Sequence, residues 1–74
     1  MLLNELNVGE EAVVKNMIAE NRRLSDLGLV EGTRVKCIFR SPLGDPVAYK
    51  IKGALVAIRS EDARNVALEV GEYE

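Results

Sequence analysis

Three observations predict that this chain folds as a small, mainly β domain. Its 74 residues allow one domain, which buries only roughly 60% of the surface that the unfolded chain exposes. Short segments alternate apolar and polar side chains or are rich in β-branched residues, as strands are. Glycine and proline fall between these segments, where turns are needed. We therefore expect residues 1–74 to form a single domain without linkers or repeats.

Five segments have the composition of strands. The first, AVVKNMI, is rich in β-branched side chains and too short for a stable helix. Apolar and polar residues alternate in the next two, where Ile38 breaks the outward polarity of the first, and Gly53 permits a tight reversal into the fourth. The expected strands cover residues 12–18, 33–40, 47–52, 54–59 and 66–70.

One short helix is expected over residues 21–27. The asparagine that begins this segment can cap the helix, and Gly28 can take the left-handed conformation that ends it. In such an ending Leu29 packs back on Leu24. Leu27 is expected to face inward with them.

Two further segments complete the pattern. Residues 41–46 hold two prolines and a glycine, which cannot continue a ladder and so form a loop. Ser60 is expected to cap a helical turn over about residues 61–64, with acidic residues at its positive end. Such a set of short elements suits a small SH3-like β-barrel of about five strands better than a sandwich, and closing the sheet would hide most strand edges.

The central hairpin has a predicted register. Pairing Phe39 with Val47 keeps the alternating apolar residues of both strands inside, with Val35, Cys37 and Tyr49 among them. The same register places like charges opposite each other, in the pairs Lys36 with Lys50 and Arg34 with Lys52. Either these basic side chains extend into water, or they face an anion from the terminal strands, a partner or a phosphate.

The net charge of −2 conceals a strong division. Residues 1–20 carry a charge of −3, residues 21–59 carry +5, and residues 60–74 carry −4. The basic middle of the chain is therefore flanked by acidic ends, and this middle contains the hairpin.

Catalytic and cofactor chemistry is not indicated. The chain has no histidine, which is the commonest general acid or base and the commonest nitrogen ligand of transition metals. Its single cysteine, Cys37, falls in register with Val35 and is expected to be a small buried hydrophobic residue. No nucleotide-binding glycine motif is present. We therefore expect neither an enzyme nor a bound cofactor.

Nucleic acid and membrane are also poor candidates. Only three aromatic residues are present and two are expected in the core, so no stacking platform remains, and the pI is about 5.1. No apolar run approaches the roughly 18 residues of a membrane span. The start of the chain lacks the features of a secretory signal, so a cytoplasmic location is expected.

Four phrases of the sequence, in this order and spacing, resemble the FeoA family of ferrous iron transport proteins. They are RLSDLGL at 23–29, EGT at 31–33, SPLGDPV at 41–47 and VAIR at 56–59. The resemblance implies an SH3-like barrel and a cytoplasmic accessory role beside FeoB, the permease with a GTP-hydrolysing domain that imports ferrous iron. Iron is linked to the chain by this resemblance alone. The alternative is an SH3-like adaptor, because FeoA-like domains also end iron-dependent repressors as interaction modules.

The expected docking surface combines the basic hairpin with the proline-rich loop. Rigid prolines lower the cost of ordering a loop on binding. At the tip of this loop Leu43 is either an exposed apolar contact or folds back over the end of the barrel. The candidate partner-binding residues are Arg34, Lys36, Arg40, Pro42, Leu43, Asp45, Lys50 and Lys52.

Overall fold

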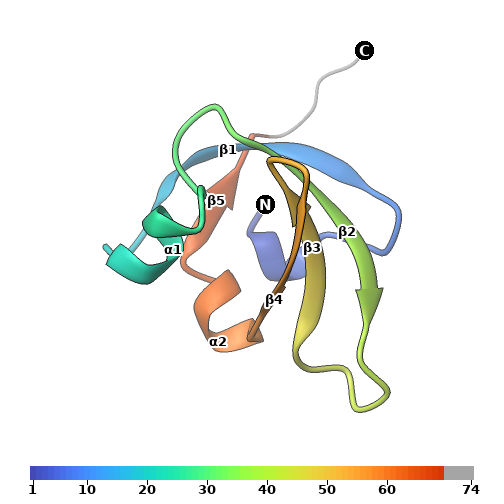
Figure 1. The fold of residues 1–74 in the computed structure, drawn as a ribbon. Helices are drawn as coiled ribbons and strands as arrows, with labels where there is room; N and C mark the ends of the chain where they lie inside the picture. The colour runs from blue at the N-terminus through green and yellow to red at the C-terminus, as the bar shows by residue number, and fades with distance from the viewer. Residues whose placement is uncertain (70–74) are drawn as a thin grey trace.

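The computed structural model describes residues 1–69 of the chain. Figure 1 shows a strongly curved sheet with short helical segments beside it. In chain order the elements are η1 (Leu3–Glu5), β1 (Glu11–Met17), α1 (Arg22–Asp26), β2 (Arg34–Arg40), β3 (Val47–Ile51), β4 (Ala54–Ile58), α2 (Ser60–Ala63) and β5 (Val66–Leu68).

The predicted fold class is confirmed. All five expected strands are present and pair antiparallel in the order β4-β3-β2-β1-β5. The last strand ends at Leu68, and Val70 of the predicted strand lies outside the described residues. Within residues 1–69, the edge strands β4 and β5 do not pair with each other. The start of the chain covers the outer edge of β5 instead, because Leu2 forms a bridge with Ala67 and the Leu68 N–H donates to the Met1 carbonyl. The helices of this part of the chain lack the length and apolar character that crossing a membrane requires.

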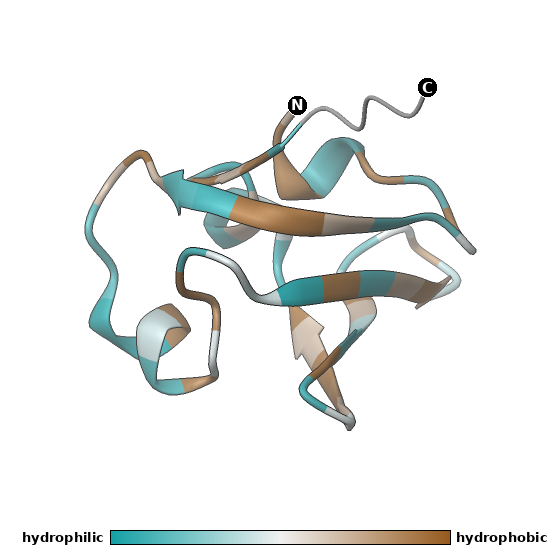
Figure 2. Ribbon diagram, turned by 90° about the horizontal axis from the view of Figure 1, so that it is seen from above, coloured by the Kyte–Doolittle hydropathy of each residue, from teal (hydrophilic) through white to brown (hydrophobic). Residues whose placement is uncertain are grey.

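The core lies on the concave side of the sheet. Apolar and polar residues alternate along the strands (Figure 2), which turns one set inward. Segments outside the sheet complete the core with Leu3 and Leu6 from the start of the chain, Leu24 and Leu29 around α1, and Ala63 of α2.

The ends of α1 follow the sequence prediction. The Asn21 side chain accepts a hydrogen bond from the Leu24 N–H at 3.2 Å, and Gly28 has a φ of +105°. The Leu29 N–H donates to the Leu24 carbonyl at 3.1 Å, which is the ending expected there. Leu24 and Leu29 are fully buried. The prediction for Leu27 is wrong, because its side chain is 37% exposed.

The first half of the hairpin also has the predicted register. Lys36 lies directly opposite Lys50, and Cys37 lies opposite Tyr49. Val35 and Cys37 are fully buried, as expected from their positions in the alternation.

The second half of the hairpin has a different register, because a β-bulge interrupts β2. Ile38 has no partner on β3, so Phe39 pairs with Ala48, and Arg40 pairs with Val47. An extra residue in one strand reverses the face to which the following side chains point. The predicted pairing of Phe39 with Val47 is therefore wrong, and the Phe39 side chain is 50% exposed rather than buried.

The cap of α2 also differs from the prediction. The helix begins at Ser60, and the preceding Arg59 occupies the N-cap position without a side-chain capping bond. The backbone N–H of Ser60 instead donates to the Asp45 carboxylate at 2.8 Å. Ser60 is thus not the cap, and a carboxylate from the β2–β3 loop satisfies the first turn of α2.

Candidate docking surface

Four of the eight candidate residues line one shallow depression on the outside of the sheet. Its volume is about 660 Å³, and Glu11, Val30 and Glu31 also contribute to its lining. We call this depression the cationic groove and define it by Arg34, Lys36, Lys50 and Lys52.

The strands aim two of these lysines outward. On β2 the neighbours of Lys36 are the buried Val35 and Cys37, and on β3 the neighbours of Lys50 are the buried Tyr49 and Ile51. Because side chains alternate across a strand, both lysines must point to the outer face. They are direct cross-strand partners, so the two ammonium groups share one side of the sheet.

The turn between β3 and β4 supplies Lys52. Lys52 and Gly53 form the two-residue connection, with φ values of 51° and 83°. Positive φ at both positions is the geometry of a type I′ turn, which favours asparagine or glycine over lysine. A Cβ placed on Gly28 would lie 3.2 Å from the Cδ of Lys52, so the lysine stem passes over this glycine.

The groove carries more positive than negative charge. Arg34 forms an ion pair with Glu11 at 3.8 Å, and both side chains are largely exposed. An exposed pair of this kind contributes only about 0.2–1 kcal/mol. Among residues 1–69, the three lysines of the groove form no ion pair.

The other four candidates lie at the far end of the hairpin, and two of them hold the loop in place. The bulge turns Arg40 to the same face as Val47, and its guanidinium donates to the Leu6 carbonyl at 3.1 Å. Asp45 caps α2. Both therefore have structural partners, whereas Pro42 is simply exposed.

Leu43 is an exposed apolar tip. Its side chain is 94% exposed, so the alternative in which it folds back over the barrel end is wrong. Single exposed apolar side chains are common on protein surfaces, so its exposure makes Leu43 available for contact with a partner but does not by itself identify a docking site.

Sequence reasoning missed two apolar residues of the same outer face. Phe39 is 50% exposed because of the bulge, and Leu55 of β4 is 60% exposed and lies opposite Lys50. The local sign of the bulge in the sequence is the apolar Ile38, which falls on the expected outward face of the strand. Leu55 could have been recognised, because it falls on the polar side of the β3–β4 alternation.

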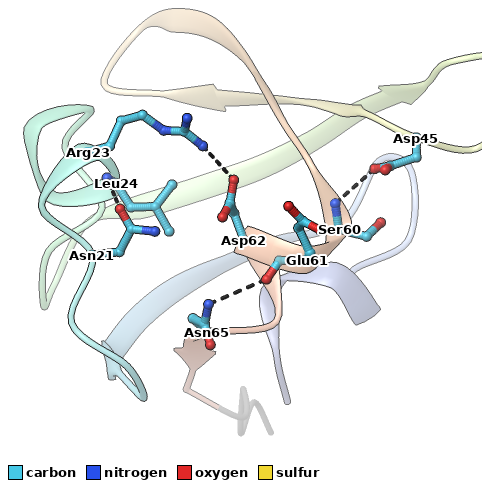
Figure 3. A network of polar contacts seen from close by, with 8 residues as sticks. All are labelled: Asn21, Arg23, Leu24, Asp45, Ser60, Glu61, Asp62 and Asn65. Atoms are coloured by element: carbon cyan, nitrogen blue, oxygen red, sulfur yellow. Dashed lines mark hydrogen bonds and ion pairs between the residues drawn. The ribbon is translucent and has the colours of Figure 1, made fainter.

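A separate polar network joins α1 to α2 (Figure 3). Arg23 forms an ion pair with Asp62 at 2.5 Å, and the Asp62 side chain is only 17% exposed. In the same view Asn65 donates to the Glu61 carbonyl at 3.4 Å. The ion pair ties α1 to α2, whereas the Asn65 bond is local to the end of α2.

The two buried titratable groups of the hairpin have no visible chemical role. Burial raises the pKa of the Cys37 thiol, which disfavours the reactive thiolate. Burial also raises the pKa of Tyr49 to about 12, and its hydroxyl donates to the Leu3 carbonyl at 3.3 Å. In residues 1–69 no three histidine, cysteine, aspartate or glutamate side chains gather as a metal site would require. The absence of a cofactor stays a prediction.

Comparison with known proteins gives one family. The chain matches the model of the FeoA domain over residues 1–70. It is 33% identical over 73 residues to a fusion of Fe(2+) transport protein A and the Fe(2+) transporter FeoB from Porphyromonas gingivalis. That match covers 95% of this chain but only 9% of the fusion protein, so the chain spans a small part of that relative.

Solved structures of similar sequence have the same fold. A FeoA protein from Chlorobium tepidum superposes with a TM-score of 0.85 at 38% identity, over 95% of this chain and 70% of that one. The FeoA of Stenotrophomonas maltophilia, solved in complex with zinc and described as a prokaryotic SH3 domain protein, gives 0.82 at 29% identity. That superposition covers 93% of this chain and 89% of the other.

Proposed function

The chain belongs to the FeoA domain family, and on this premise we propose that it is a cytoplasmic accessory of ferrous iron transport that docks on a FeoB-type permease. The match to the FeoA domain model and the identity to the fusion protein confirm the resemblance found in the sequence. The observation that carries the proposal is the fusion in Porphyromonas gingivalis, where a relative of this chain and a FeoB transporter form one polypeptide. Joining two proteins covalently raises their effective concentration, which favours a weak mutual contact.

The β2–β3 loop has the properties of a docking element. Its tip presents Leu43 to solvent, while Asp45 ties its base to the first turn of α2. Arg40 holds the start of the loop to the segment around Leu6. A preorganised loop loses little conformational entropy on binding. Less of the free energy gained by burying its apolar tip is therefore spent on ordering the loop.

A calorimetric titration tests the proposal. The titrant is the GTP-hydrolysing, membrane-free part of a FeoB permease from the same organism, and the cell holds the full chain or its Leu43→Asp variant. We expect binding by the parent and an affinity at least roughly tenfold lower for the variant, as for a central apolar contact. Ile18→Asp is the matched control, because Ile18 is also an exposed apolar residue at 62%.

Two results would contradict the proposal in different ways. Absence of binding by the parent chain would remove the permease as the partner. Equal losses in the Leu43→Asp and Ile18→Asp variants would show that the loop tip has no specific role.

A further inference from the structure

The cationic groove contains an unfavourable arrangement of charge. Lys36 and Lys50 are direct cross-strand partners, and like charges in this position repel each other. On the β1 side of Lys36 the cross-strand partner is Glu11, but this carboxylate pairs with Arg34 instead. The four cations share the groove with only two carboxylates, those of Glu11 and Glu31, so an excess of positive charge remains.

The turn adds a second unfavourable feature at the same place. Lys52 has a φ of 51°, where a residue with a Cβ is strained. Strained residues of this kind concentrate at functional sites. The aliphatic stem of Lys52 passes over Gly28 at the edge of the groove, and the residue is exposed. Charge repulsion and backbone strain thus converge on one surface, where a bound anion would relieve the repulsion.

From these features we infer that the cationic groove binds an acidic segment of a partner protein. The positive side chains are exposed and spread over two strands and a turn, which suits carboxylates spaced along an extended chain better than one compact phosphate. Two exposed apolar residues lie beside them: Val30 at 42% lines the groove, and Leu55 at 60% lies opposite Lys50. The segment therefore carries apolar side chains between its acidic ones. The inference deepens the proposed function and rests on it only for the identity of the partner.

The test uses a fluorescein-labelled peptide in which glutamate and leucine alternate, with binding followed by anisotropy. We expect the full chain to bind it with an affinity that falls as salt is added. The Lys36→Gln/Lys50→Gln double variant should bind at least roughly tenfold more weakly at low salt. A second double variant, Lys15→Gln/Arg64→Gln, removes two exposed cations outside the groove and should retain most of the affinity.

Thermal unfolding gives an independent readout. The Lys36→Gln/Lys50→Gln variant should melt at or above the temperature of the parent chain at low salt, because the repelling pair has been removed. Adding the peptide should raise the melting temperature of the parent but not of this variant. If the variant melts at a lower temperature than the parent in the absence of peptide, the two lysines do not repel each other in the folded chain, and the inference loses its basis.

Other outcomes overturn the inference directly. Equal affinity of the peptide for the parent chain and for the Lys36→Gln/Lys50→Gln variant would show that the groove does not bind it. Displacement of the peptide by tripolyphosphate at concentrations below those of unlabelled peptide would assign the groove to phosphate instead.

A permease titration run in parallel separates the two proposals. If the peptide binds through the groove but the permease does not bind, the proposed function fails and this inference stands. If the permease binds the parent and the groove variant alike while the peptide does not bind, the inference fails and the proposed function stands.

Discussion

Replacing Tyr49 with phenylalanine tests how the polar contact inside the barrel contributes to stability. The Tyr49 side chain is 1% exposed, and its hydroxyl donates to the Leu3 carbonyl at 3.3 Å. A buried hydrogen bond contributes about 1 kcal/mol net. This carbonyl also accepts the Leu6 N–H at 3.1 Å, so it keeps a donor in the variant. We therefore expect a loss of only about 0.5–1 kcal/mol in the free energy of unfolding at pH 7.

The same substitution should reverse the order of stability in alkali. Burial raises the pKa of Tyr49 to about 12 in the folded chain, against about 10 in the unfolded chain. The stability that protonated Tyr49 contributes to the folded chain is fully present below pH 10. It is lost as the pH rises toward 12, because only the unfolded chain releases the tyrosine proton in this window. One pKa unit corresponds to about 1.4 kcal/mol, so the full loss is roughly 3 kcal/mol. Phenylalanine has no proton to release, and the two stability curves should cross between about pH 10 and 11.

Urea unfolding followed by circular dichroism at a series of pH values measures both effects. The buried Cys37 thiol titrates in both proteins, so most of its contribution cancels in the difference between them. Tyr73→Phe, which alters the only other tyrosine, is the control and should leave the alkaline loss in place. Curves for Tyr49→Phe and the parent that stay parallel up to pH 11 would refute a pKa raised by burial.

Three other substitutions should have measurable effects on unfolding by urea. Gly28→Ala should cost about 1–2 kcal/mol, more than Gly32→Ala, because both glycines have positive φ but only the first would bring its Cβ against another side chain; equal costs would show that this contact is unimportant. Asp45→Ala should cost about 1 kcal/mol through loss of the α2 cap, and Asp45→Asn should cost less because it keeps an acceptor oxygen. Should the two variants unfold alike, the capping bond would have no measurable role. A double-mutant cycle on Arg23 and Asp62 should give a coupling below about 1 kcal/mol that shrinks with added salt, and a salt-independent value would argue against an electrostatic pair.

Much of the fold follows from local patterns that tertiary packing does not alter. Asn21 and Gly28 begin and end α1 through bonds to the backbone within a few residues, so their roles can be predicted from residue type alone. Period-two alternation predicts which side chains of β2 and β3 share a face, and this places Lys36 opposite Lys50. Three of the four phrases that resemble the family fall at the end of α1 or in turns and loops, where few residue types fit, whereas VAIR lies mainly in β4.

The docking surface is only partly visible in the sequence. The basic side chains of the groove could be identified from their alternation, and Leu43 from its place in the proline-rich loop. The exposure of Leu43 could not be predicted from the sequence, because it depends on where the loop packs against the rest of the barrel.

Two features depend on contacts between distant parts of the chain, namely the register in the second half of the hairpin and the cap of α2. Ile38 breaks the outward polarity of β2, but this pattern does not reveal that the residue is unpaired. The bulge sends Phe39 out to solvent and turns Arg40 toward the chain start. The cap of α2 likewise comes from Asp45, at a separation of 15 residues from Ser60. The strands, the helix and the charged face could be predicted from residue patterns, since these features depend on near neighbours. The bulge and the distant cap depend on how two strands and a loop fit around one core, which only packing in three dimensions resolves.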